Sequence, residues 1–148
     1  MKKLAIIAIL AATMGAATAT EIGLRASRNT SAGLNGTGIT LNKSFGQFGV
    51  EASADRTVVD AGSLTRFGVL GTMDVAKVGG VTLTAKAGAA YIDPAAGKAG
   101  YTGVVGLGAS YPVAKNVSLV ADYSFQQGQA RVSGFNGNNL SFGVKYAF

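Results

Sequence analysis

The stretch that decides the fold is Leu140-Ser141-Phe142-Gly143-Val144-Lys145-Tyr146-Ala147-Phe148, the last nine residues. Every second residue in it is large and apolar, and the residues between them are small or charged. Because successive side chains of a β-strand point to opposite faces, this pattern predicts a strand with one apolar and one polar face. An apolar strand that ends on an aromatic residue would leave an unprotected edge in a soluble sheet. We therefore expect it to close a barrel against the first strand, with its apolar face toward lipid.

An alternating terminal strand that ends in Tyr-x-Phe resembles the assembly signal of Gram-negative outer-membrane β-barrel proteins. The rest of the chain resembles the small eight-stranded members of that class, the OmpA/OmpX-type barrels with a porin-like outer-membrane β-barrel domain. The resemblance implies that the outer-membrane assembly machinery reads the terminal strand and inserts the chain into the cell outer membrane. The residues that would form this terminal assembly signal are Leu140, Phe142, Val144, Tyr146 and Phe148.

The N-terminus predicts export. Lys2 and Lys3 precede an apolar run at residues 4–12, and small residues follow at 17–19. This is the layout of a cleaved secretory signal peptide, so residues 1–19 are interpreted as the signal peptide and 20–148 as one outer-membrane β-barrel domain. A membrane-anchoring helix is the alternative, but the apolar run is too short to span a bilayer well. With a cleaved signal peptide, the chain is expected to reach the outer membrane through the periplasm.

The rest of the chain predicts an all-β fold, an eight-stranded antiparallel up-and-down transmembrane β-barrel. Segments of about ten residues alternate between apolar and polar positions and are separated by turn-forming residues, as in barrels of this kind. We expect strands at 21–28, 34–43, 47–56, 64–75, 80–91, 100–111, 117–127 and 140–148. The connections are alternately short (44–46, 76–79, 112–116) and longer (29–33, 57–63, 92–99, 128–138). Short periplasmic turns and longer extracellular loops produce this asymmetry. The glycine-rich loop 128–138 is predicted to be the most mobile.

The composition argues against catalysis. The 148 residues include 22 glycines but no cysteine and no histidine, and only 14% of the residues are charged. A Ser-His-Asp or Cys-His arrangement is impossible without histidine, and the sequence has no His/Cys metal cluster. We therefore expect no catalytic, cofactor-binding or metal-binding residues, no cofactor, and a protein that is not an enzyme. The basic residues are scattered singly, which predicts no nucleic-acid partner.

The charges on the polar strand faces are the candidate functional residues. On a closed barrel they would face the lumen, where unpaired charges are costly, so they should pair with one another. One interpretation is an ion-pair plug that fixes the barrel shape; the other is a selectivity lining for a narrow pore. Inward-facing glycines that leave room for water would favour the pore. The predicted lumen charge network is Arg25, Glu51, Asp55, Arg66, Lys86, Asp122 and Lys145, with Glu21 and Asp74 also on polar faces.

Other basic residues predict lipid partners. Lys43, Lys77 and Lys115 lie at the short turns, where the two alternatives are contact with phospholipid headgroups and ordinary solvation. Four further basic residues lie at the outer ends of strands or in the outer loops, where the phosphates of lipopolysaccharide are plausible partners: Arg28, Arg56, Lys98 and Arg131.

We therefore expect a monomeric integral outer-membrane protein with a structural or surface-interaction role. The alternatives are a narrow porin that passes ions or small solutes and a secreted soluble β-protein that binds an apolar ligand. A protein interior that packs Phe142, Leu119 and Val105 together, with Lys86 and Asp122 in solvent, would overturn the membrane interpretation.

Overall fold

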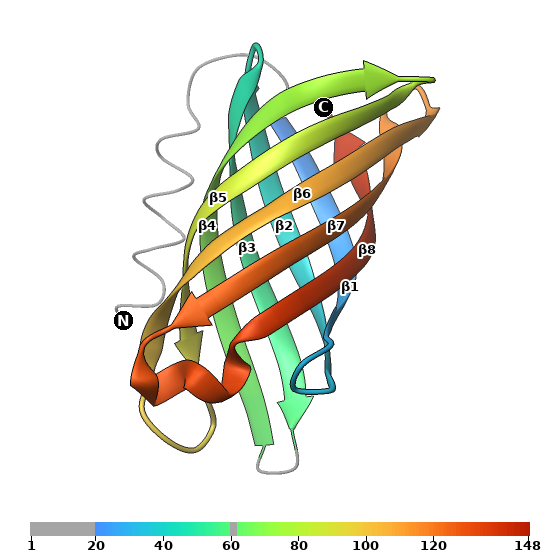
Figure 1. Cartoon of the computed structure of the whole chain (residues 1–148). Coiled ribbons are helices and arrows are strands. Elements are labelled where there is room, and N and C mark those ends of the chain that lie inside the picture. The colour runs from blue at the N-terminus through green and yellow to red at the C-terminus, as the bar shows by residue number, and fades with distance from the viewer. Residues whose placement is uncertain (1–19, 60–61) are drawn as a thin grey trace.

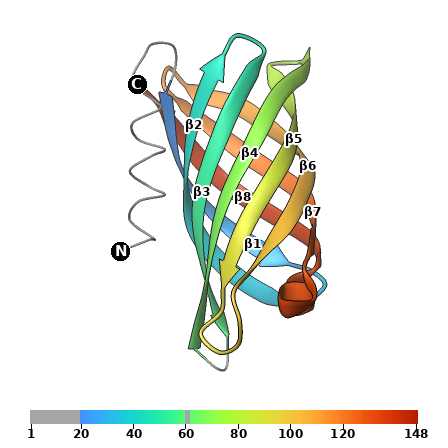
Figure 2. The ribbon, with the colours of Figure 1, turned by 90° about the vertical axis from the view of Figure 1, so that its left-hand side faces the viewer.

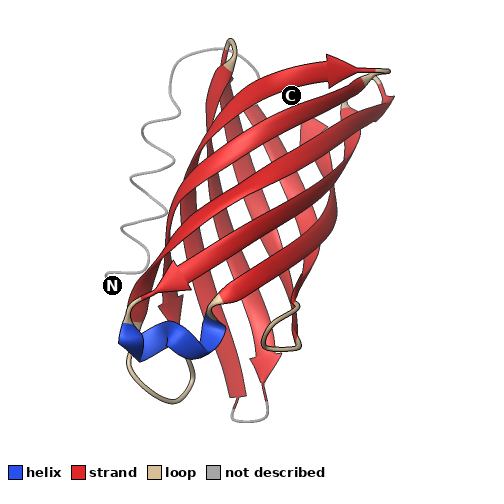
Figure 3. Cartoon of the chain, in the orientation of Figure 1, coloured by secondary structure: helices blue, strands red, loops and turns tan. Residues whose placement is uncertain are grey.

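A computed structural model describes residues 20–59 and 62–148, and the predicted signal peptide lies outside this range. The described chain folds into a closed barrel in which every strand pairs antiparallel with its sequence neighbours (Figure 1). The strands are β1 (Thr20–Asn29), β2 (Leu34–Phe45), β3 (Phe48–Val59), β4 (Gly62–Val78), β5 (Val81–Asp93), β6 (Gly100–Ala114), β7 (Val117–Gly128) and β8 (Gly137–Ala147). A single 3₁₀ helix in this part of the chain, η1 (Ala130–Phe135), connects β7 to β8 (Figure 3). The predicted eight-stranded barrel is confirmed.

The terminal strand closes the barrel as its sequence predicts. Leu24 of β1 lies opposite Val144 of β8, and the antiparallel register continues along the seam. At the end of the seam, the backbone N–H of Phe148 donates to the carbonyl oxygen of Thr20 at 3.1 Å. Closure leaves no unpaired strand edge, so the exposed edge that an apolar terminal strand would otherwise present does not exist.

The two ends of the barrel differ. The turns after β2, β4 and β6 lie at the end that also holds the C-terminus, which we name the turn end (Figures 1 and 2). The connections after β1 and β5 and the helix η1 lie at the opposite end, the loop end (Figure 1). The turn between Val78 and Val81 contains only Gly79 and Gly80, both with positive φ (58° and 83°). Two consecutive residues with positive φ form the tight hairpin turn that matches the twist of the strands, and glycine adopts that conformation without strain.

The apolar strand faces point outward. Val105, Leu119 and Phe142 are 56%, 49% and 59% exposed, whereas Lys86 is buried inside the barrel. The strands contain between 10 and 17 residues. A strand tilted at about 45° needs roughly 9–11 residues to span a bilayer. The barrel is therefore long enough, and apolar enough on its outer face, for a membrane, and the predicted orientation of the faces is confirmed.

Exposed or half-buried aromatic residues gather at both ends of this apolar surface, as in membrane barrels. Those near the turn end are Phe45, Phe48, Tyr111, Tyr146 and Phe148, and those near the loop end are Phe67, Tyr91, Tyr101 and Phe125. Ring contacts join some neighbours: the Tyr91 and Tyr101 centroids lie 5.2 Å apart, and those of Tyr146 and Phe148 lie 5.6 Å apart.

Two connections differ from the predictions. Strands β3 and β4 extend through most of the predicted loop 57–63, because Thr57 continues to pair with Leu64 and Val58 with Ser63. The predicted mobile loop 128–138 is instead largely folded as η1, with Val132 fully buried. The glycines of this segment suggested mobility, whereas the buried side chain of Val132 attaches it to the barrel. No helix within residues 20–59 and 62–148 is long and apolar enough to cross a membrane.

Candidate functional site

Six charged side chains form one continuous chain of ion pairs across the interior, which we name the ion-pair chain. Cations and anions alternate along it, three of each. Asp55 is shared by two arginines: its Oδ2 lies 2.6 Å from Arg25 Nη2 and 3.2 Å from Arg66 Nη1, and its Oδ1 accepts from Arg25 Nε at 2.8 Å. The order of the chain is Arg66, Asp55, Arg25, Glu51, Lys86 and Asp122.

The second half of the ion-pair chain runs toward the turn end. Arg25 Nη1 lies 3.2 Å from Glu51 Oε1, and the other oxygen of Glu51 lies 2.7 Å from Lys86 Nζ. Lys86 also contacts Asp122 at 2.6 Å. The side chain of Glu51 is only 1% exposed, so its charge is compensated entirely by these cations. Such pairs lose much of their attraction to desolvation, but removing one partner leaves an expensive buried charge.

Two glycines allow the ion-pair chain to form. Gly38 of β2 lies between Arg25 and Asp55 in the sheet, opposite both of them. A Cβ atom at Gly38 would collide with the carboxylate of Asp55 and lie 2.7 Å from the carbonyl oxygen of Ala54. Gly108 of β6 has the same role, because a Cβ there would lie 2.9 Å from Lys86 Cε and 2.5 Å from an oxygen of Asp122. Each glycine lets the charged side chains of the flanking strands meet above it.

The inward glycines leave less open space than the sequence interpretation allowed. A Cβ at each of them would meet neighbouring protein atoms closer than 3.0 Å, so the space above them is already filled. At Gly106, for example, the side chain of Ser124 lies 2.7 Å from the Cβ position. The glycines concerned are Gly23, Gly49, Gly68, Gly88, Gly106, Gly108 and Gly143. They serve close packing inside a narrow barrel.

The seventh predicted network residue, Lys145, lies apart from the ion-pair chain. Its Nζ is 3.6 Å from Glu21 Oε2 near the turn end, and both side chains are partly exposed. Asp74 accepts a hydrogen bond from the hydroxyl of Thr84 at 3.0 Å and is not a member of the ion-pair chain. The structure therefore joins six of the seven predicted residues and places Lys145 in a separate pair.

A buried apolar cluster, which we name the stopper, lies in the interior at the loop end, and the sequence analysis did not predict it. It consists of Leu64 of β4, Ile92 of β5 and Val132 of η1, which are at most 5% exposed, with Phe135 packed against them. Leu64 lies on the same face of β4 as Arg66. An apolar residue at a position whose parity assigns it to the polar, inward face was the sequence signal that could have revealed the stopper. A second apolar cluster contains Leu70, Ala90 and Val104.

Hydrogen bonds fix the stopper to the strands. The carbonyl oxygen of Phe135 accepts from Asn29 Nδ2 at 3.1 Å and from Gln126 Nε2. Asn136 Oδ1 accepts from the backbone N–H of Gly128 at 2.7 Å. The helix η1 is thus attached to both β1 and β7.

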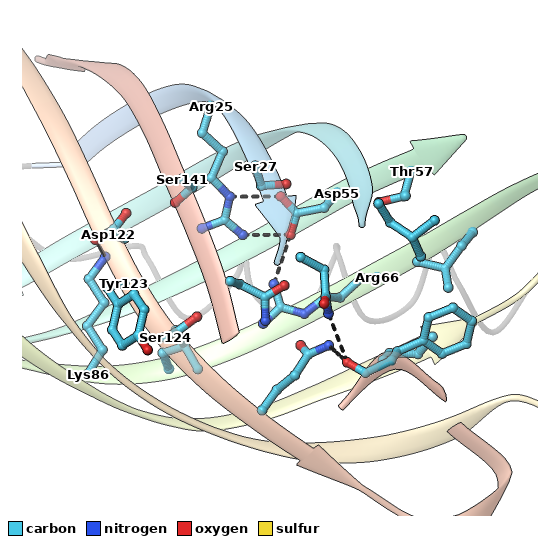
Figure 4. Close-up of a pocket in the computed structure, with 18 of the residues that line it drawn as sticks. Arg25, Ser27, Asp55, Thr57, Arg66, Lys86, Asp122, Tyr123, Ser124 and Ser141 are labelled. Carbon is cyan, nitrogen blue, oxygen red and sulfur yellow. Dashed lines mark hydrogen bonds and ion pairs between the residues drawn. The ribbon is translucent and has the colours of Figure 1, made fainter. Parts of the chain in front are cut away.

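The interior contains two spaces of different character. A chamber of about 70 Å³ lies between the ion-pair chain and the stopper, and Figure 4 shows its lining, including Arg25, Asp55 and Arg66. A larger polar vestibule of about 290 Å³ lies toward the turn end. Glu51, Lys86 and Asp122 line both spaces, so the ion-pair chain forms the partition between them.

The basic residues predicted to meet lipids occupy several environments. Arg28, Arg56, Lys98 and Arg131 are all exposed near the loop end, the first two on the outer faces of β1 and β3. Lys77 and Lys115 are exposed at the turn end. Lys43 differs from the prediction, since it is buried, with Nζ 5.9 Å from the centroid of the Phe45 ring. Within the described residues, no group of three or more acidic, histidine or cysteine side chains is placed to hold a metal ion.

The fold is that of the small eight-stranded outer-membrane β-barrels. Neisserial surface protein A superposes with a TM-score of 0.60 at 18% identity, over 88% of this chain and 96% of that one. The Yersinia pestis outer-membrane protein Ail, in a phospholipid bilayer nanodisc, gives 0.59 at 14% identity, over 89% and 100%. A de novo designed transmembrane β-barrel gives 0.66 at 14% identity, over 88% and 95%. No protein-family model and no curated protein matches the sequence. At these identities the likeness establishes the fold.

Proposed function

We propose that this chain is a monomeric integral protein of the Gram-negative outer membrane, with a sealed interior and a structural or surface-interaction role without catalysis. The apolar outer surface and its two aromatic girdles support insertion into a bilayer. The single observation that carries the sealed interior is the combination of the ion-pair chain and the stopper, which fill successive levels of the lumen.

The cost of opening this interior supports a barrier rather than a pore. A permeating ion would have to separate buried pairs such as Glu51 with Lys86, which would leave their charges without partners in a region shielded from water. It would also have to displace Val132 and its apolar partners. Both barriers lie in series along the same lumen, so neither alone opens a continuous path.

A narrow porin is the second candidate. The vestibule of about 290 Å³ at the turn end supports it, because a polar, partly open space already reaches the ion-pair chain from that side. A pore would then require rearrangement only in the loop-end half. The third candidate, a soluble protein that binds an apolar ligand, is disfavoured by the outward position of residues such as Phe142 and Leu119.

Planar-bilayer conductance separates the first two candidates. The full chain is refolded in detergent, its folding is verified by a change in gel mobility on boiling, and it is then added to a planar bilayer. The proposal expects no steady conductance. A steady, salt-dependent conductance of the verified folded barrel would instead establish the porin. Fractionation tests the location, since recovery in the soluble periplasmic fraction would contradict membrane insertion.

The proposal includes partners at both membrane surfaces. At the loop end, the exposed guanidinium groups of Arg28 and Arg56 extend from otherwise apolar outer strand faces, a position suited to lipopolysaccharide phosphates. Lys98 and Arg131 extend the same basic surface. Neutralising all four residues should weaken association with lipopolysaccharide, and unchanged association would refute this part of the proposal.

At the turn end, Lys77 and Lys115 would contact phospholipid headgroups, each contributing at most about 1 kcal/mol. The terminal strand, with Tyr146 and Phe148 at its end, would be read by the outer-membrane assembly machinery. Replacing Phe148 by serine should reduce the amount of folded barrel in the outer membrane, and an unchanged amount would argue against that role.

A further inference from the structure

The chamber between the ion-pair chain and the stopper contains buried polar atoms whose hydrogen-bonding capacity is unused. Arg66 Nε, Gln126 Oε1 and Asn139 Nδ2 are shielded from solvent and have no hydrogen-bond partner in the described part of the chain. All three residues line the chamber. Buried polar atoms are almost always satisfied by protein, ordered water or a ligand, so three such atoms around one cavity mark a place where water or a small ligand binds.

The donors among these atoms favour an anion. Arg66 Nη1 donates to Asp55 at 3.2 Å, while Arg66 Nε remains free for a second acceptor. A guanidinium group binds a carboxylate through two adjacent N–H groups, so Arg66 has a donor left for such a ligand. Asn139 Nδ2 supplies another donor at the same cavity.

The charges around the chamber are unevenly distributed. The ion-pair chain begins with the cation Arg66 at one end and finishes with the anion Asp122 at the other. Arg66, Asp55 and Arg25 line only the chamber and not the vestibule, and they carry one net positive charge. Glu51, Lys86 and Asp122 also line the chamber, so the six charges around it sum to zero. The positive charge is concentrated at the Arg66 end, where two guanidinium groups share the single carboxylate of Asp55.

The size and the apolar wall restrict the ligand. The chamber, at about 70 Å³, has space for only a few water-sized groups. Leu64, Ile92 and Phe135 form part of its lining. A carboxylate with a very short hydrocarbon part fits both the polar and the apolar side, whereas a large or highly charged anion does not.

We infer that the chamber is a binding site for a small monocarboxylate of the size of acetate, whose carboxylate accepts hydrogen bonds from Arg66 Nε and Asn139 Nδ2. A water molecule beside it donates to Gln126 Oε1, and the methyl group faces the stopper. The inference depends only on the interior geometry, so it stands or fails separately from the conductance of the barrel.

The test uses the full chain, labelled with ¹⁵N and refolded in detergent in the presence of acetate, because η1 covers the chamber. Sodium acetate replaces sodium chloride at constant ionic strength, and the Nε–H resonance of Arg66 is followed. A saturable shift is expected at Arg66. Arg56, which is exposed on the outer face of β3, should show none.

Two variants and one larger ligand complete the design. Arg66→Lys keeps a cation beside Asp55 but lacks the Nε–H group, so acetate should bind about tenfold more weakly or worse, followed by the ¹³C signal of labelled acetate. Arg56→Lys is the matched control and should bind acetate normally. Should Arg66→Lys fail to fold, Asn139→Leu removes the other donor and should also weaken binding. Benzoate is too large and should not bind.

Several results would overturn the inference. These are a non-saturating response, equal shifts at Arg66 and Arg56, equal binding by the Arg66 and Arg56 variants, or binding of benzoate as well as acetate. A high-resolution structure from acetate that showed only water in the chamber would also overturn it.

Discussion

Replacing Gly38 by alanine places a methyl group where the carboxylate of Asp55 lies. The Cβ atom would also lie 2.7 Å from the carbonyl oxygen of Ala54, which belongs to the neighbouring strand and cannot move without disturbing the sheet. Asp55 would therefore have to leave its position beside Arg25. The bidentate contact at 2.6 and 2.8 Å would be lost, and Arg25 would keep only Glu51 as a partner.

The magnitude follows from two opposing effects. Alanine in a strand is favoured over glycine by about 0.5–1 kcal/mol. Breaking a buried ion pair costs about 3–5 kcal/mol. The net expectation is a loss of about 2–4 kcal/mol in the free energy of unfolding for Gly38→Ala.

Gly71→Ala provides the matched control. Gly71 lies on the outer face of β4, where a Cβ would meet only the carbonyl oxygen of Ala87 at 3.7 Å. This variant should be unchanged or stabilised by up to about 1 kcal/mol. The chain has no tryptophan, so urea unfolding in lipid vesicles is best followed by circular dichroism together with gel mobility. Equal stability of the two variants would refute the idea that Gly38 is needed for the Arg25–Asp55 contact.

Three further perturbations probe other parts of the barrel. Asp55→Asn removes the carboxylate shared by two arginines and should lower the unfolding free energy by about 3–5 kcal/mol. Glu21→Gln, in a partly exposed 3.6 Å pair, should change the unfolding free energy by less than about 1 kcal/mol. Similar losses for both variants in urea titrations would contradict the argument that burial makes the Asp55 pairs costly to break. Val132→Gly empties the centre of the stopper and should speed proteolytic cleavage within η1 while leaving the strands protected, so cleavage at the wild-type rate would show that Val132 does not anchor the helix. Phe142→Lys places a charge on the outer face and should destabilise the barrel in vesicles by up to about 2–4 kcal/mol, and a neutral effect would mean that this face does not meet lipid.

The sequence alone determined the strand count, the barrel closure and the orientation of the faces. These follow from local alternation: in a strand, the parity of a residue decides its face, so Phe142 and Lys145 are assigned to opposite sides without any tertiary information. The same parity placed Arg25, Glu51, Asp55, Arg66, Lys86 and Asp122 in the interior.

The tertiary structure decided which interior residues meet. Arg25 and Asp55 lie on strands separated by β2, and their contact depends on the register that puts Gly38 between them. Strand parity excludes a register shift of one residue but not one of two residues, so the sequence alone cannot tell which side chains lie beside a given inward glycine. The stopper also depends on tertiary packing, because Val132 becomes a core residue only when the chain after β7 folds back over Leu64 and Ile92. Long-range packing, which no local pattern encodes, brings the stopper together and leaves the chamber between it and the ion-pair chain.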